Sequence, residues 1–435
     1  MRYSALKFVL EIVSLKRTCR LNSLTILFPM YYTAKHLGLM PFRVVPVDKA
    51  DPRGVLVHKV NHRRTFKFEL CRLGLSFSVI QFGIRIWAIV ECLKYITSTL
   101  MDLNVTPAVI CTTGNYCSVF GILLMHIFVS FLIILMLPFR LRVTGTILNE
   151  TELLLTKYYK NQSCGYDIPW PTLILFSFVA MSYLSSIYYL HYNKNRVLFW
   201  LFSYVKVSSN VLINVVVILS VVAEKSYEMI NQHLRDLASQ KPEIGQRSQS
   251  LEELMVLHWF VTDYVEHISH CFGVELCIIM MEIYAQLIIR MFVTSYVLFL
   301  HGLFPLSLDH QLVGVFDLLS VTSNLSYLCY RCDRVVYKGS QSQLFLQDIC
   351  IQNNLDKYSK EVIHLFMMRL NCRKIVVDGY GFFTINLAQL VKIIGVVLTY
   401  FVVLVQFQTD NNASEHEIKV NKTDANSCEW PCVQF

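Results

Sequence analysis

The chain has 435 residues, of which 54% are hydrophobic and only 16% charged, against about 25% charged in ordinary soluble domains. A mean hydropathy of +0.45 excludes a disordered protein, a coiled coil and a conventional soluble enzyme, because most of the surface cannot face water. The formal net charge of +8 comes from basic residues separated by apolar blocks, which is typical of membrane topology rather than of nucleic-acid binding. The sequence therefore predicts an all-α polytopic membrane protein without a nucleic-acid partner.

Apolar stretches long enough to cross a bilayer recur along the chain. A spanning helix needs about 20 mostly apolar residues, and seven stretches qualify: 73–101, 107–139, 168–193, 197–223, 276–308, 310–330 and 379–409. An eighth stretch, 21–42, contains Pro29 and Lys35, and we interpret it as an amphipathic or re-entrant segment. The prediction is seven transmembrane helices.

The distribution of basic residues predicts the orientation. Thirty of the thirty-nine lysine and arginine residues lie in 1–72, 139–168, 222–271 and 331–374, and only four lie in the other connections. Cytosolic loops carry such an excess, so we expect a cytosolic N-terminus and, after seven spans, an extracellular C-terminus. Three glycosylation sequons would then face outward: Asn104, Asn412 and Asn421.

The predicted organisation alternates membrane blocks with polar segments. The successive parts are a cytosolic N-terminal region (1–72), four spans (73–223), a linker with helix extensions (224–271), two spans (272–330), an anchor segment (331–378), the last span (379–409) and an extracellular tail (410–435). The linker and the anchor segment show helical apolar spacing, so their helices should continue beyond the bilayer and pack into a cytosolic bundle. A loop is expected at 239–250, where proline, glycine, glutamine and serine gather.

The last predicted span ends in Thr399 and Tyr400, five apolar residues, and then Gln406 and Phe407. This pattern resembles the C-terminal signature of the insect gustatory receptor family. Residues 382–386 (Phe-Phe-Thr-Ile-Asn) and the stretch Leu-Gly-Leu-Met-Pro-Phe-Arg that begins at Leu37 are similar to that family as well. Because length and topology also agree, the resemblance covers nearly the whole chain.

The resemblance implies a ligand-gated, non-selective cation channel in the plasma membrane of chemosensory neurons. It implies four subunits, either copies of this chain or a mixture with other gustatory receptor subunits, and a last helix that lines the central pore. Gln406 and Phe407 would lie near the outer constriction, with Thr399 and Tyr400 lower on the same helix. The implied partners are a small tastant, permeating cations and membrane lipid, and no cofactor is implied.

Helical spacing, independently of the resemblance, indicates which residues of the last predicted span lie on one face. Thr399, Val403 and Gln406 share one stripe, which could face a pore axis. A ring of apolar side chains can close a pore by excluding water, and a ring of amides can pass partly hydrated cations. Without fourfold assembly, Gln406 is only a polar residue near a membrane interface, and spacing alone leaves both interpretations open.

Ionisable residues inside predicted spans are candidates for function. Arg290 and Asp317 lie roughly 16 and 10 Å from the outer ends of their spans, at about 1.5 Å per residue, so adjacent helices could pair them around an outward-facing pocket. Tyr188, Tyr189 and Trp200 lie at a similar depth, and aromatic walls with few polar groups suit a small organic ligand. An interfacial aromatic belt with a structural ion pair explains the same residues, and both interpretations stay open.

Other polar patterns indicate no chemistry. Four side chains follow one another at helical spacing suited to metal ligands: Asp263, Glu266, His267 and His270. No second helix supplies a matching set, so we interpret them as a solvated helix face and expect no metal. Cys329 and Cys332 have redox-motif spacing without a thioredoxin-like surrounding, and we interpret them as buried thiols. The sequence has no phosphate-binding loop, nucleophile elbow or zinc-protease helix, so we do not expect an enzyme.

The alternative function is a seven-span receptor of the G-protein-coupled type. Asp333 and Arg334 resemble part of the Asp-Arg-Tyr motif of that class, but they lie at the end of span six instead of span three. The predicted cytosolic N-terminus also opposes that class. For the channel, Phe401 stands where sugar receptors typically have glutamate, so a bitter or other plant-derived compound is the first expectation and a sugar such as fructose the second.

Overall fold

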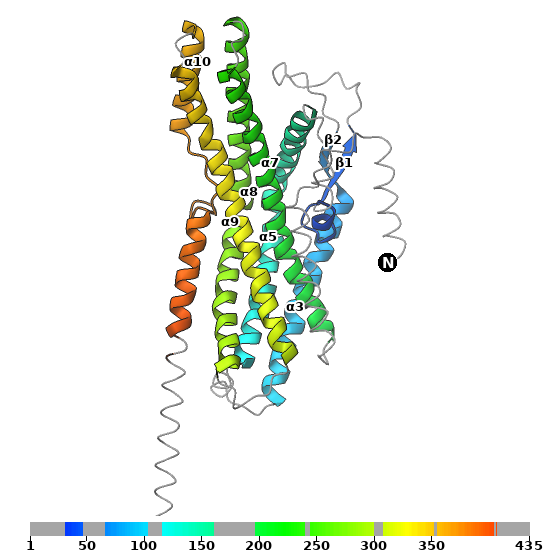
Figure 1. Ribbon diagram of the computed structural model, residues 1–435. Helices are drawn as coiled ribbons and strands as arrows, with labels where there is room; N and C mark the ends of the chain where they lie inside the picture. The colour runs from blue at the N-terminus through cyan, green and yellow to red at the C-terminus, as the bar shows by residue number, and fades with distance from the viewer. Residues whose placement is uncertain are drawn as a thin grey trace, which may run out of the picture.

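The structure is a computed structural model, and it describes residues 31–46, 66–102, 115–160, 196–239, 244–299, 308–351, 355–403 and 406. Its elements are, in chain order, β1 Phe42–Pro46, β2 Phe66–Leu70, α3 Arg72–Asp102, α5 Asn115–Lys160, α7 Arg196–Ser239, α8 Ile244–Phe299, α9 Leu308–Ile351 and α10 Lys357–Cys372. An apolar C-terminal helix, Leu387–Val403, follows. The long helices lie side by side in one elongated bundle, and the C-terminal helix runs along its outside (Figure 1).

Long apolar helices confirm the predicted helical membrane class. Four described stretches are long and apolar enough to cross a membrane: Arg72–Lys94 in α3, Leu124–Leu155 in α5, Val207–Ser239 in α7 and Ser248–Ile289 in α8. They correspond to predicted spans one, two, four and five. Predicted span six lies within α9, whereas predicted span three, 168–193, lies outside the described residues. The chain is a multi-pass membrane protein, and its seven spans and cytosolic N-terminus stay predictions.

Helix α7 forms the centre of the bundle. It packs most extensively on α9 and also contacts α3, α5 and α8. Every side chain from 211 to 224 is buried, which is the pattern of a helix that is apolar all round and enclosed by its neighbours. The other helices are therefore positioned around α7.

The helices continue well beyond the predicted spans. α7 keeps a buried stripe at Tyr227, Ile230 and Leu234, which confirms the predicted extension of this helix. α8 already begins at Ile244, so the second half of the predicted loop 239–250 is helical instead. α5 likewise runs unbroken to Lys160, past the predicted end of its span.

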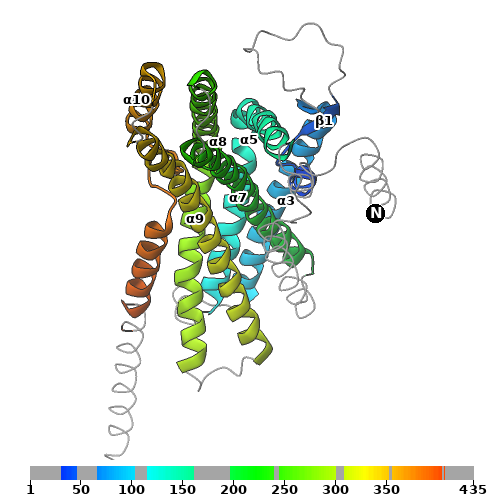
Figure 2. The same ribbon diagram turned by 45° about the horizontal axis from the view of Figure 1, so that its top comes forward.

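The extended ends of three helices pack together with α10. We call the parts of α7 and α8 within 224–271, the part of α9 from 331 to 351, and α10 the extension bundle. α10 contacts both α8 and α9, and it lies beside their upper ends in two views (Figures 1 and 2). The predicted helical bundle outside the membrane spans is thus present in the fold.

The N-terminal region contains a small antiparallel sheet that the sequence did not predict. β1 pairs with β2, with Phe42 opposite Leu70. Phe42 and Phe68 are both 3% exposed, and the backbone N–H of Phe68 donates to Asn149 Oδ1 on α5 at 2.9 Å. Each strand has five residues, a length at which alternation of apolar residues hardly separates a strand from a loop.

The described part of the predicted re-entrant segment, residues 31–42, folds back against α3. It forms a short helix and turns at Gly38, whose φ of 72° is in the left-handed region. A methyl group at Gly38 would lie 2.8 Å from Gln81 Cγ, so this approach requires glycine. Arg85, fully buried in α3, donates to the carbonyl oxygen of Leu37 at 3.4 Å. Residues 31–42 are therefore folded on the bundle and do not form one continuous spanning helix.

Candidate functional site

The C-terminal helix presents one face to its own subunit and the opposite face away from it. Three side chains form the buried stripe: Leu390, Ile393 and Val397. The side chains of the predicted pore stripe are exposed: Thr399, Val403 and Gln406. With 3.6 residues per turn, the two stripes lie on opposite sides of the helix. Within its own subunit, the predicted pore stripe is therefore uncovered, as are most other described positions of this helix, such as Val391 and Leu398.

Three of the four residues that define the C-terminal motif lie within the described part of the chain: Thr399, Tyr400 and Gln406. Thr399 Oγ1 donates to the carbonyl oxygen of Gly395 at 2.9 Å, inside its own helix. Tyr400 is 54% exposed, Gln406 is exposed, and Phe407 lies outside the described residues. Their role in lining a pore stays a prediction.

The predicted last span includes a turn that is not helical. Residues 377–385 are closed by backbone hydrogen bonds of 2.8 and 2.9 Å. Tyr380 and Gly381 have φ angles of 55° and 79°, a left-handed conformation that a right-handed helix cannot contain. The helix begins only at Leu387, so the predicted boundary at 379 was wrong. We call residues 373–386, between α10 and the C-terminal helix, the link.

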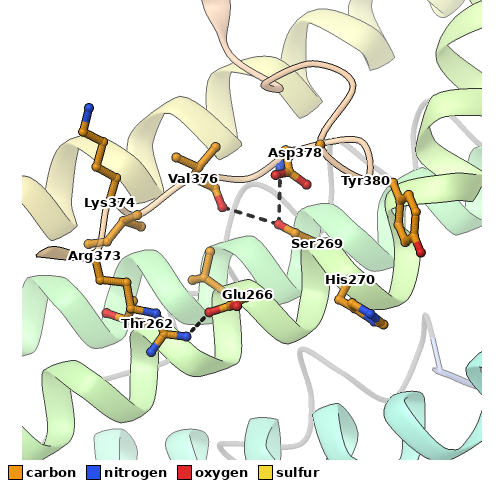
Figure 3. A pocket seen from close by; sticks show the side chains of 12 residues that line it. Thr262, Glu266, Ser269, His270, Arg373, Lys374, Val376, Asp378 and Tyr380 are labelled. Carbon is orange, nitrogen blue, oxygen red and sulfur yellow. Dashed lines mark hydrogen bonds and ion pairs between the residues drawn. The ribbon is translucent and has the colours of Figure 1, made fainter.

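The link lies along α8 and lines with it an open cavity of about 550 Å³ (Figure 3). Its polar and aromatic lining comes from both sides: Glu266, Ser269 and His270 of α8, and Arg373, Asp378 and Tyr380 of the link. At one end, the ring centroids of His270 and Tyr380 lie 6.1 Å apart, with the ring planes tilted by 55°. The walls carry charges of both signs, so their charge alone indicates neither an anion nor a cation as a ligand.

Arg373 ties the link to α8. Its guanidinium forms ion pairs with the carboxylates of Asp263 and Glu266, while His267 pairs with Glu150 of α5 at 3.1 Å. The predicted solvated face is thus a half-exposed surface of ion pairs. In the described part of the chain, no three potential ligand side chains gather into a metal site.

A buried polar stripe on α8 was missed by the sequence analysis. Glu275, Glu282 and Gln286 are at most 2% exposed. Glu275 pairs with Arg140 of α5 at 3.2 Å, and Glu282 pairs with His126 of α5 and accepts from Gln286 Nε2 at 3.0 Å. The available signal was their spacing by seven and four residues, which places them on one helix face. Polar groups buried within a membrane bundle are held by partners, so this stripe fixes α8 against α5.

The predicted ligand-binding residues lie largely beyond the described side chains. Tyr188 and Tyr189 are outside the described residues, and Trp200, Arg290 and Asp317 belong to α7, α8 and α9 without described side chains. α8 and α9 do pack against each other, as the predicted pairing of Arg290 with Asp317 requires. The predicted sequons also lie outside the described residues: Asn104, Asn412 and Asn421.

A buried carboxylate joins α7 to α9 in the extension bundle. Glu224, whose side chain is 4% exposed, accepts hydrogen bonds from Arg331 at 2.9 Å and Arg334 at 3.0 Å. Beside it, Cys329 and Cys332 are fully buried in α9, which confirms their interpretation as buried thiols. The carboxylate is therefore paired twice where the two helices leave the predicted membrane region.

His258 lies inside the extension bundle between α7, α9 and α10. Its ring is 5.0 Å from the Tyr227 ring and 5.4 Å from the Phe366 ring, and Nε2 lies 3.4 Å from the carbonyl oxygen of Gly339. Burial lowers the pKa of His258 to about 4, because the charged imidazolium would lose its hydration. His258 is therefore neutral at pH 7.

We expect the extension bundle to lose stability in mild acid. A histidine in the unfolded chain titrates near pH 6.5, so the contribution of neutral His258 is complete above that pH and is lost as the pH falls toward 4. At pH 5 the loss should be about 2 kcal/mol, at about 1.4 kcal/mol per pKa unit. Thermal melting of the solubilised protein at pH 7.5 and 5 should show a smaller acid shift for His258→Gln than for the unmodified chain. His364→Gln, at an exposed histidine of α10, is the matched control, and equal acid shifts in both variants would contradict this assignment.

The arrangement of these parts corresponds to a known receptor family. A family model described as 7tm Chemosensory receptor matches residues 27–411. The chain belongs to the 7tm chemosensory receptor family. No individual curated protein sequence matches it. Among solved structures, insect olfactory receptor OR5 from Machilis hrabei is similar, both alone and in complex with eugenol, with a TM-score of 0.59 and 12% identity over 87% of this chain and 97% of that one.

Family membership covers all the described parts of this chemosensory receptor. The matched region begins before the folded-back N-terminal segment and ends after Gln406, so it includes the extension bundle, the link and the C-terminal helix. The resemblance indicated by the C-terminal motif is thereby confirmed at the level of the chemosensory receptor family. The similarity to OR5, at low identity, concerns the fold.

Proposed function

We propose that this chemosensory receptor is a gustatory, ligand-gated cation channel and not an enzyme. The observation that carries the proposal is the exposed stripe of the C-terminal helix, which faces away from the buried stripe Leu390, Ile393 and Val397. This stripe combines the hydroxyl of Thr399 and the amide of Gln406 with apolar side chains. Rings of amides and apolar side chains are the elements from which pores select and gate ions.

Assembly around one axis would cover this stripe. Four subunits related by rotation would bring four C-terminal helices together and bury the same surface of each. The extension bundle supports such an assembly, because α10 exposes an apolar stripe formed by Tyr358, Leu365 and Met368, each between 45 and 53% exposed. The subunits are either four copies of this chain or a mixture with other gustatory receptor subunits.

The proposed ligand is a small organic tastant. Eugenol in the structure of OR5 supports a small organic molecule as the class of ligand for this fold. A bitter or other plant-derived compound is the first choice and a sugar such as fructose the second, because Phe401 replaces the glutamate typical of sugar receptors. The proposed location is the plasma membrane of chemosensory neurons.

Substitutions in the C-terminal motif test the channel. Phe407→Ala should raise the cation current that flows without ligand, because a smaller side chain weakens an apolar constriction that excludes water. Gln406→Ala should instead change ion preference, since it removes amide dipoles that partly replace the hydration of a cation. Both effects are measured as whole-cell current in cells that express each variant, with surface expression determined in parallel.

The matched control is Leu93→Ala, which shortens an exposed apolar side chain of α3. α3 lies on the far side of the bundle from the C-terminal helix (Figures 1 and 2), so this variant should keep the current of the unmodified channel. Gln406 and Phe407 do not line a pore if both variants reach the surface with unchanged basal current, ion preference and ligand response.

A further inference from the structure

The turn of the link and the C-terminal helix form one continuous unit. Within the turn, Asp378 and Thr384 form an antiparallel bridge. Immediately afterwards, Asn386 Oδ1 accepts from the backbone N–H of Gln389 at 2.8 Å and caps the helix, a contact that fixes the direction of the first helical turn. Because turn and cap follow each other directly, a displacement of the turn is carried into the helix.

Ser269 of α8 holds the link by two hydrogen bonds. Its hydroxyl donates to the carbonyl oxygen of Val376 at 3.4 Å and accepts from the backbone N–H of Asp378 at 3.3 Å. Figure 3 shows the Ser269 side chain reaching from α8 to the link between these two residues. One side chain thus satisfies two backbone groups of the link.

Gly273, one helical turn further along α8, forms the second contact. A methyl group at this position would lie 2.6 Å from the backbone nitrogen of Tyr380 and 3.1 Å from its Cα. Tyr380 itself has a φ of 55°, which is unfavourable for a bulky side chain and persists where surrounding contacts enforce it. The missing side chain at Gly273 therefore lets the left-handed turn lie directly on α8.

α8 also connects this contact to the interior of the membrane bundle. It is one unbroken helix from Ile244 to Phe299, and it carries both the Ser269–Gly273 contact and the buried stripe that includes Glu282. Glu282 lies about 14 Å along the helix from Gly273, at about 1.5 Å per residue. Movement of α8 relative to α5 would therefore reach the link through a rigid element.

We propose that Ser269, Gly273 and Tyr380 form the joint through which α8 positions the pore helix and so sets the balance between closed and open channel. This inference rests on the proposed channel function and extends it to how that function is regulated. These residues act by positioning the helix and are separate from the pore stripe. The two contacts hold the turn that directly precedes the pore helix, and neither Ser269 nor Gly273 belongs to the pore stripe, so breaking them should change gating without changing the pore itself.

The joint is tested first by its structure. Gly273→Ala must displace the turn, because the added methyl group would overlap the backbone of Tyr380. Ser269→Ala introduces no clash and removes only the hydroxyl. In hydrogen exchange on the purified full-length receptor, both variants should speed the exchange of the Asp378 amide. Gly83→Ala in α3, where an added methyl group meets nothing within 4 Å, is the matched control and should leave the link unchanged.

The same variants are then compared for gating in liposomes that contain the full-length receptor. Thallium influx is measured without ligand and with eugenol, fructose or caffeine in turn. Both joint variants should shift the influx without ligand by roughly fivefold or more relative to Gly83→Ala, since coupling between two sites of a protein is commonly of that size. Assembly and melting temperature should stay at their control values in Ser269→Ala.

Two different results would overturn this assignment: one contradicts the joint alone, and the other contradicts the channel function as well. Faster amide exchange in the link together with influx equal to that of Gly83→Ala would show that the channel works but that the joint does not set its gating. If the unmodified receptor gives no cation influx under any of these conditions, the proposed channel function fails and the joint fails with it.

Discussion

Replacing both Arg331 and Arg334 with methionine should lower the free energy of unfolding by about 3–5 kcal/mol, because a buried carboxylate is left without its partners. Glu224 is 4% exposed at its side chain, and both arginines of α9 donate to it. The measurement is the thermal melting of the solubilised receptor at pH 7.5. Because methionine keeps the length and much of the packing of arginine, the loss reports mainly the uncompensated charge.

Two further variants separate charge from packing. Adding Glu224→Gln to the double variant removes the buried charge and should recover much of the lost stability. Lys225→Met breaks the neighbouring ion pair with Glu228, whose side chains are 49% and 39% exposed, and should cost less than about 1 kcal/mol. Equal melting temperatures for the double variant and Lys225→Met would show that the buried pairing does not stabilise the extension bundle.

Much of the helical framework could be predicted because apolar composition and helical spacing are visible within short stretches of sequence. The chain from 211 to 224 is buried on every side, and a segment enclosed in this way is mostly apolar, which composition reveals directly. The continuation of α7 beyond the predicted span was also predictable, since Tyr227, Ile230 and Leu234 keep one helical stripe. Both inferences need only the 3.6-residue period and the length of a bilayer span.

The link could not be predicted because its conformation depends on a distant part of the chain. Its residues from 379 onward are predicted to begin the last span, whereas Tyr380 and Gly381 adopt a left-handed backbone conformation. The turn is fixed by contact with Gly273, and Arg373 pairs with Asp263 at a separation of 110 residues. Sequence spacing identifies neighbours on one helix, but it does not show which charge on another segment approaches them.

For the candidate pore stripe, too, the spacing along one helix could be predicted, whereas contacts with other segments could not. Spacing alone placed Thr399, Val403 and Gln406 on one stripe, and the structure adds that this stripe lies opposite the buried face of the helix. Whether other subunits cover it depends on assembly, which one chain does not contain. The sequence motif indicates that the helix lines a pore. The exposed apolar stripe of α10 in the extension bundle is a surface at which the assembly required for that role can be tested.

Phe366→Ala should destabilise the subunit by about 3–5 kcal/mol, the usual cost of removing a large buried aromatic side chain. Phe366 is 1% exposed and packs edge-on against His258 of α8 at 5.4 Å. The cavity left behind would loosen α10 from α8. The measurement is the melting temperature of the solubilised receptor, together with its oligomeric size in mild detergent.

Leu365→Ala, at the neighbouring residue of α10, should leave the stability of the subunit nearly unchanged but weaken its assembly. Leu365 is 45% exposed, and substitutions at exposed positions usually change stability by no more than about 0.5 kcal/mol, so the melting temperature should stay within a small margin. If the exposed stripe of α10 joins subunits, this variant should nevertheless lose the tetramer and run as a smaller species, because it removes apolar surface from the interface. A stable tetramer of unchanged size in Leu365→Ala and in Met368→Ala would show that α10 does not hold the subunits together, and assembly would then have to rest on the C-terminal helices alone.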